Sequence, residues 1–286
     1  MTRTHSLLAF IFTLVLSGLA AAQAIGPDTV FVAVTVNGPK KVAAPGLKAE
    51  NFQITEDGVE QKIIAFSPAD GPWDINILLA NSALLPGRAD RTSNAIRDAV
   101  DTFQKTSHPM SKIKIDELHF GSDAMYAAID RNLVDLQKTT NPRRGLIVIT
   151  DGFDSPGGDA ANGLVEYSRK LNIPIWFLYT RTQGPDPTAQ VGARGANYSL
   201  TGGESLTVVA EQTGGAIYFV DALHQLEAQC KDLANELRNK YVLGFNSTND
   251  KKDDKWRKLK LKFTAPAGQK LDTSMKGKYF VPKPLK

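Results

Sequence analysis

The feature that most constrains the fold is an unbroken apolar run, Leu-Ile-Val-Ile at residues 146–149, that stops at Thr150-Asp151-Gly152. A parallel strand buried between two layers of helices is apolar on both faces and therefore has this pattern. The Asp-Gly pair indicates a turn at the carboxyl end of the strand. Ligands of open α/β sheets bind at that edge, so Asp151 is a candidate functional residue. Its carboxylate could hold a metal ion, poise a proton or cap the next helix.

Residues 71–240 alternate between apolar runs and amphipathic segments, which predicts a doubly wound α/β domain with a mostly parallel sheet. Helix caps are predicted at Thr92 or Ser93 and at Asp123. Gly214-Gly215 predicts a left-handed cap at a helix end. Strands are predicted at 75–80, within 112–120, and at 146–150, 173–179 and 216–220.

The two ends of the chain have a different pattern, with alternating apolar and polar residues typical of half-buried strands. In the first end, residues 25–70, Asp57-Gly58 lies between two such runs and predicts a hairpin. The second end comprises residues 241–286. Each end is too short to bury a core alone. We therefore expect them to pair into one small β-sandwich, into which the α/β domain is inserted.

The first 24 residues predict a secretory signal peptide. Arg3 precedes an apolar run from residue 7, and Ala22-Gln23-Ala24 supplies small residues for cleavage after Ala24. The apolar run is too short for a good membrane anchor, and no other segment reaches the length of a spanning helix. We expect a secreted or periplasmic protein. Its single cysteine, Cys230, lies in an amphipathic pattern and predicts a small buried side chain rather than a redox group.

The charge is unevenly distributed along the chain. The whole sequence carries a formal net charge of +4, yet residues 250–286 hold twelve basic and four acidic residues. A basic tail can bind anionic polymers or membrane surfaces. Within it, however, Lys258, Lys260 and Lys262 alternate with apolar residues, which favours a strand with one solvated face. We therefore expect no nucleic-acid partner.

Three segments have distinctive motifs. The first reads Gly-Leu-x-Ala-Glu-Asn-Phe-x-Ile-x-Glu-Asp-Gly-x-x-Gln-x-Ile at 46–63, the second Leu-Ile-Val-Ile-Thr-Asp-Gly at 146–152, and the third Glu-Leu-Arg-Asn-Lys-Tyr-Val-Leu-Gly-Phe at 236–245. Together they resemble the von Willebrand factor A-related proteins of the Acidobacteria type. The likeness covers nearly the whole mature chain in the right order. It implies a von Willebrand factor A fold within the sandwich. The family usually has two strands between the helices near residues 103 and 125, but this chain has room for one, so we expect a smaller sheet with its antiparallel edge strand missing or rudimentary.

The resemblance also implies a metal-ion-dependent adhesion site, built from Asp-x-Ser-x-Ser, a Thr of a second loop and the Asp of Thr-Asp-Gly. Here the first motif has Ala80 in place of the Asp and Leu84 in place of the second Ser. Ser82, Asp123 (at the Thr position) and Asp151 remain as oxygen ligands of a degenerate site. Oxygens of these kinds suit Mg²⁺. Otherwise, the carboxylates are helix caps or solvated loop groups.

The expected function is therefore non-catalytic binding of another extracytoplasmic protein, in adhesion or as a scaffold, through the loops at the carboxyl edge of the sheet. No cofactor is expected. Two alternatives remain open: Mg²⁺-dependent ligand binding through Ser82, Asp123 and Asp151, and a metal-dependent hydrolase at the same carboxylates. No nucleophile elbow, phosphate loop or dinucleotide fingerprint accompanies them, and His108, His119 and His224 lack metal-ligand spacing.

Overall fold

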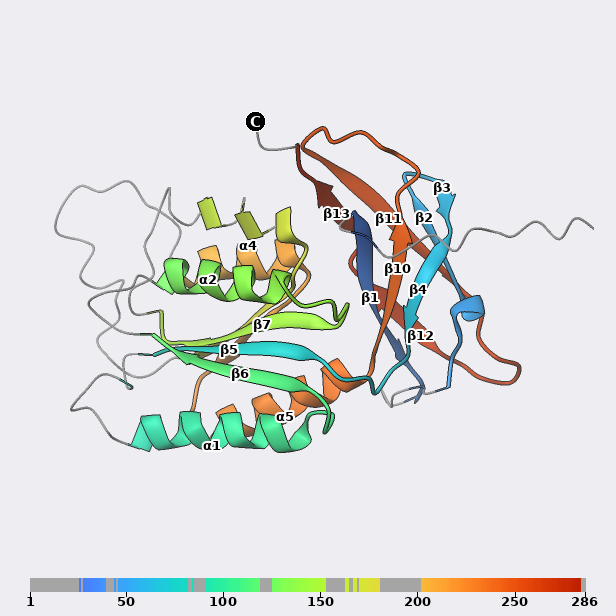
Figure 1. The fold of residues 1–286 in the computed structure, drawn as a ribbon. Helices are drawn as coiled ribbons and strands as arrows, with labels where there is room; N and C mark the ends of the chain where they lie inside the picture. The colour runs from blue at the N-terminus through green and yellow to red at the C-terminus, as the bar shows by residue number, and fades with distance from the viewer. Residues whose placement is uncertain are drawn as a thin grey trace, which may run out of the picture.

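The computed structural model describes the α/β unit and the sandwich, which lie side by side (Figure 1). The described residues are 26, 28–39, 44, 46–81, 84, 91–118, 125–152, 163–164, 167–168, 170–180 and 202–283, without the side chains of 202–205. The expected signal peptide, Ser82, His119 and Asp123 lie outside this set. Within it, no helix combines the length and apolar character needed to cross a membrane.

The α/β unit is built on a parallel sheet with the strand order β6-β5-β7-β8-β9. Every neighbouring pair of these strands is parallel, so the described part of the sheet has no antiparallel edge, as expected from the single run between 112 and 120. Numbered along the chain, the order is 2-1-3-4-5, one of the two common orders of doubly wound folds. The strands are β5 (Asp74–Ala80), β6 (Lys112–Glu117), β7 (Arg144–Thr150), β8 (Ile175–Thr180) and β9 (Ile217–Val220).

Helices cover both faces of this sheet (Figure 1). α1 (Arg91–Thr106) and α5 (His224–Arg238) bury their apolar sides on one face, and α2 (Met125–Gln137) and α4 (Gly202–Thr213) do so on the other. β7 lies in the middle of the sheet, where its side chains meet both helical layers, which explains its unbroken apolar run. The predicted apolar face of α1 is confirmed, but the helix begins at Arg91, so Thr92 and Ser93 lie inside its first turn rather than ahead of it.

The predicted sandwich is confirmed, because both of its sheets combine strands from the two ends of the chain. One sheet has the order β12-β1-β10-β4 and the other β13-β11-β2-β3. Lys258, Lys260 and Lys262 are exposed on β11, opposite buried Leu259, so this strand has one solvated face as predicted. A short helix, η2 (Ala49–Asn51), precedes β2. The strands are β1 (Thr29–Asn37), β2 (Phe52–Glu56), β3 (Val59–Gln61), β4 (Ile63–Ser67), β10 (Lys240–Asn246), β11 (Lys255–Phe263), β12 (Asp272–Met275) and β13 (Lys278–Val281).

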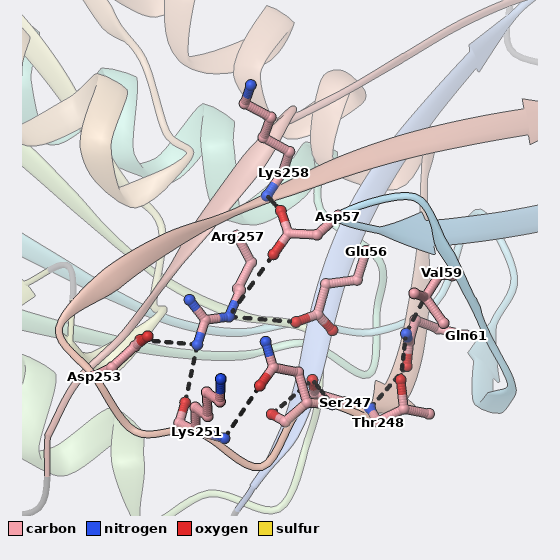
Figure 2. Close-up of polar contacts among 11 residues, drawn as sticks. Glu56, Asp57, Val59, Gln61, Ser247, Thr248, Lys251, Asp253, Arg257 and Lys258 are labelled. Atoms are coloured by element: carbon pink, nitrogen blue, oxygen red, sulfur yellow. Dashed lines mark hydrogen bonds and ion pairs between the residues drawn. The ribbon is translucent and has the colours of Figure 1, made fainter.

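The β2–β3 hairpin turns at Asp57-Gly58 as predicted. Both residues have positive φ, 47° and 92°, which is the requirement of a tight two-residue hairpin turn. A buried arginine ties this turn to the segment before β11 (Figure 2): Arg257 Nη2 donates to the Lys251 carbonyl at 3.0 Å and to Asp253 Oδ1 at 2.8 Å. Its Nε lies 3.7 Å from the carboxylate of fully buried Glu56. The charged cluster therefore joins the two ends of the chain inside the sandwich.

A second buried arginine, Arg143, holds the junction between the two units. Its side chain is 1% exposed and lies over the Trp73 ring, 4.9 Å from the ring centre. It donates to the carbonyls of Pro68 (2.9 Å), Leu237 (3.0 Å) and Lys240 (2.7 Å). Pro68 belongs to the segment that enters the α/β unit, and the other two belong to the segment that leaves it. The Arg143 side chain thus holds together the two segments that connect the sandwich to the α/β unit.

Candidate functional site

The candidate site lies at the carboxyl edge of the parallel sheet, between β5 and β7. After β5 the chain runs through α1 to β6 on one side, and after β7 it continues to β8 on the other. The ends of these neighbouring strands are therefore a point at which the connections diverge, and such points form the ligand crevices of open α/β sheets. Ala80 pairs with Thr150 there, so Asn81 and Asp151 follow two adjacent strand ends.

A buried polar network closes the floor of this edge. Asn81 is fully buried, and its Nδ2 donates to Thr180 Oγ1 at 2.8 Å. Asn81 follows β5 and Thr180 ends β8, so this bond reaches across the end of β7, which lies between them. Thr180 Oγ1 donates in turn to the Thr150 carbonyl at 3.4 Å. Three strand ends are thereby fastened to one another. Buried polar groups whose hydrogen bonds are satisfied rigidify the structure around them.

The turn after β7 is held equally closely. The Gly152 amide donates to Thr150 Oγ1 at 3.0 Å, and Gly152 has a φ of +77°. A Cβ added to this glycine would lie 2.8 Å from Tyr179 Oη, so the turn needs both the backbone freedom and the small size of glycine. Tyr179 in turn packs edge-on against Phe219 of β9, with ring centres 5.8 Å apart. Asp151 is half-buried on this rigid turn.

Two of the positions at which the resemblance implies metal ligands hold apolar side chains. Ala80, at the position of the family's first Asp, is 1% exposed and packs in the core beneath α2. Leu84, at the position of the second Ser, packs against the apolar cluster of α1 and α5. Of the three predicted ligands only Asp151 is among the described residues, which contain no group of three His, Cys, Asp or Glu able to hold a metal.

The structure also describes the cysteine and two of the histidines considered from sequence. Cys230 is 1% exposed, and burial raises the pKa of its thiol to about 12. A thiol that stays protonated is a poor nucleophile, so the predicted packing role fits. His224 is exposed at the start of α5, and His108 Nδ1 accepts a hydrogen bond from the Met110 amide at 3.2 Å.

Sequence reasoning found the strand ends but missed the link between Asn81 and Thr180. The sequence did contain a usable signal. Asn81 directly follows an apolar strand and Thr180 ends another, so each polar side chain lies where strand ends are buried. Which side chains meet across an intervening strand depends on the strand order, and the residue pattern does not specify that order.

Comparisons with known proteins found similarity among solved structures only. Neither the models of known protein families nor the curated proteins match this sequence. A von Willebrand factor type A protein from Catenulispora acidiphila is similar at 10% identity and a TM-score of 0.40, covering 89% of this chain and 73% of that one. BatB from Bacteroides thetaiotaomicron (15% identity, TM-score 0.35) and an aerotolerance-related membrane protein from Bacteroides fragilis (17%, 0.34) each cover 58% of this chain and 98% of their own. At these identities, the similarities concern the fold alone.

Proposed function

We propose that the protein is a secreted or periplasmic, non-catalytic interaction protein that binds another extracytoplasmic protein through the carboxyl edge of its parallel sheet. The observation that carries this proposal is the rigid edge between β5 and β7, where Asn81, Thr150 and Thr180 fasten three strand ends. A pre-organised platform lowers the entropic cost of binding by the loops that it supports. The loops concerned are residues 81–90, 121–123 and 151–158, with 180–203 as a further candidate.

We further propose that this binding needs no metal ion. Two positions that supply oxygens in the resembling family hold apolar side chains here, the buried Ala80 and the partly buried Leu84. Mg²⁺ demands near-octahedral oxygen coordination, so the loss of two donors weakens the basis for a resident ion. The Mg²⁺-dependent alternative would rest on Ser82, Asp123 and Asp151. The hydrolase alternative would use the same two carboxylates.

A photo-crosslinking experiment tests the protein-binding proposal. A photoreactive amino acid replaces Asp151 at the carboxyl edge or, as the control, exposed Lys112 at the amino end of β6. We expect an adduct with an envelope protein from the first position only, competed by excess unlabelled protein and unchanged by EDTA. Equal adducts from both positions would refute the assignment of the edge.

Metal titration and turnover separate the two alternatives. We expect Mg²⁺ and Mn²⁺ to give no saturable heat with the mature protein. Saturable binding that Asp151→Ala abolishes would instead establish the metal-dependent form. Hydrolysis of an ester and phosphoester substrate panel, lost in the same variant, would establish the enzyme.

A further inference from the structure

A cavity lies at the end of the α/β unit opposite the candidate site, where the amino edge of the parallel sheet meets the sandwich. Its volume is about 610 Å³, and residues from β1, the β12–β13 segment and the amino ends of β7 and β8 line it. Figure 1 shows β1 on the side of the sandwich that faces the α/β unit. Cavities of roughly 300–1,000 Å³ between domains are typical sites for small organic ligands.

One wall of this interdomain cleft is apolar and aromatic. The outward face of β1 contributes Phe31 and Ala33, which are half-buried and alternate with the core valines of that strand. The α/β unit contributes Trp73 and Trp176, whose rings pack edge-on with centres 6.1 Å apart. The Asn172 amide donates to the Phe31 carbonyl at 3.3 Å and fixes the two units relative to each other beside the cleft. This wall suits the apolar part of a ligand.

The charged residues of the lining are almost all basic. The lining holds one acidic residue, Asp28, and its carboxylate pairs with Lys252 at 2.8 Å. Lys240 pairs at 2.7 Å with Glu236, a carboxylate outside the lining. The lining therefore holds more basic than acidic residues, which favours an anionic ligand. The six basic residues of the lining are Arg144, Lys170, Lys240, Lys252, Lys276 and Lys278.

Two of these lysines are held together without a carboxylate. The ammonium groups of Lys276 and Lys278 lie 5.7 Å and 4.6 Å from the centre of the Trp256 ring. Lys276 donates to the Gln212 carbonyl near the end of α4, and no described carboxylate forms an ion pair with either lysine. Burial, and then repulsion from Lys278, lowers the pKa of Lys276 to about 8. An anion between the two ammonium groups would offset both the burial of the Lys276 charge and its repulsion from Lys278.

We propose that the interdomain cleft binds a small amphipathic organic anion, with its acidic group at Lys276 and Lys278 and its apolar part against Phe31 and Ala33. The shared chemistry is a carboxylate joined to an apolar body, which an acyl chain or an aromatic ring could supply. A cation of the same shape would meet repulsion from the lining. This site is separate from the proposed protein-binding edge, because it lies at the other end of the strands.

Calorimetric titration of the full mature protein tests this proposal with three probes below their micelle concentrations. Laurate represents the acyl source, 2-naphthoate the aromatic source, and dodecyltrimethylammonium the cationic control. We expect one-to-one binding of at least one anion, at least tenfold tighter than the cation, since a factor of ten needs only about 1.4 kcal/mol. Comparable binding of the cation, or no binding of either anion, would overturn the proposal.

Matched variants place the ligand in the cleft. Ala33→Trp fills the apolar wall and leaves the charges intact, and Lys276→Glu with Lys278→Glu reverses the charge and leaves the space open. Each should weaken anion binding at least tenfold, whereas Lys260→Glu on the exposed face of β11 should not. Lys278→Gln is the milder variant for use if the double change unfolds the protein, and circular dichroism checks the fold. Binding that survives Ala33→Trp, or that Lys260→Glu weakens equally, would show attraction to general surface charge instead.

Discussion

Replacing Arg143 by Met should uncouple the two units of the protein. The guanidinium donates to three carbonyls, but the Leu237 carbonyl also accepts a bond from Trp73 Nε1 at 3.0 Å. The change therefore leaves two partly buried acceptors, at Pro68 and Lys240, without this charged donor. Losing a charged donor costs stability, whereas Met fills much of the arginine's volume and carries no charge to bury.

The expected loss can be worked out from two opposing contributions. A hydrogen bond from a charged donor contributes about 1.5–3 kcal/mol, so three contribute roughly 4.5–9 kcal/mol. Against this, burial lowers the pKa of Arg143 from 12.5 to about 10. That change corresponds to a cost of about 3 kcal/mol for holding the charge in the protein, which Met does not bear. The net loss should be about 1.5–6 kcal/mol, a large share of the roughly 5–15 kcal/mol that stabilises a typical domain.

Urea unfolding measures this loss, and calorimetry measures the coupling. Trp73 and Trp176 report on the α/β unit and Trp256 on the sandwich, so tryptophan fluorescence follows both. We expect Arg143→Met to lower the free energy of unfolding by the stated amount and to split a single calorimetric transition into two. Arg143→Lys keeps a charged donor but lacks the planar fork of the guanidinium. Its free energy of unfolding should therefore lie between those of the wild type and Arg143→Met.

The control for this prediction is Arg97→Met, since Arg97 is exposed and pairs with Glu117 at 3.0 Å. Such surface pairs contribute about 0–1 kcal/mol. If Arg143→Met were as mild as this control, or if its two units still unfolded in one transition, the assignment of the junction to Arg143 would be wrong.

Three further changes test the sandwich, the cleft and the sheet. Arg257→Met should cost about 3–5 kcal/mol, because it leaves the Glu56 carboxylate buried without its partner, and Glu56→Gln should recover part of that loss in a double-mutant cycle by urea unfolding. The folded pKa of Lys276, about 8, lies below its ordinary 10.5. From pH 8 to 10.5 the unfolded state therefore binds more protons, and wild-type stability should rise relative to Lys276→Met by up to about 3 kcal/mol, whereas a pH-independent difference would contradict this titration. Gly215→Ala should lower the melting temperature sharply, since its Cβ would lie 1.8 Å from the first carbonyl oxygen of β8, whereas Gly163→Ala meets no atom within 4 Å and should be nearly neutral.

The fold could be predicted from the sequence because its main elements have strong local patterns. The run at 146–149 is apolar on both faces since β7 lies between two helical layers, and Asp57-Gly58 turns as such pairs do. Helix starts were less predictable. Thr92 and Ser93 are good capping residues, but α1 begins at Arg91, because a residue pattern fixes a helix end only to within one or two residues.

The candidate sites were only partly predictable because they depend on contacts between distant segments. The sequence indicated the edge at Asp151 from one strand, whereas the Asn81–Thr180 bond joins residues 99 positions apart. The interdomain cleft is more distant still, since its lining combines β1, the β12–β13 segment and the amino ends of β7 and β8. The lysines at 276 and 278 looked like ordinary solvated residues of a basic tail. The position of Lys278 over Trp256 follows from the pairing of β11 with β13, and Lys276 lies just before that strand.

The insertion of the α/β unit has a consequence for the order in which the protein folds. β1 pairs with β10 in a register that joins Thr29 to Asn246. The first strand therefore cannot pair until a segment more than two hundred residues further along the chain has been synthesised. The α/β unit closes within its own stretch of chain and can form first. Closing so long a loop is slow, and until it closes the amino-terminal strands expose unpaired edges. Assembly of the sandwich should therefore be the late step, and the interval before it the one in which the chain is most prone to aggregate.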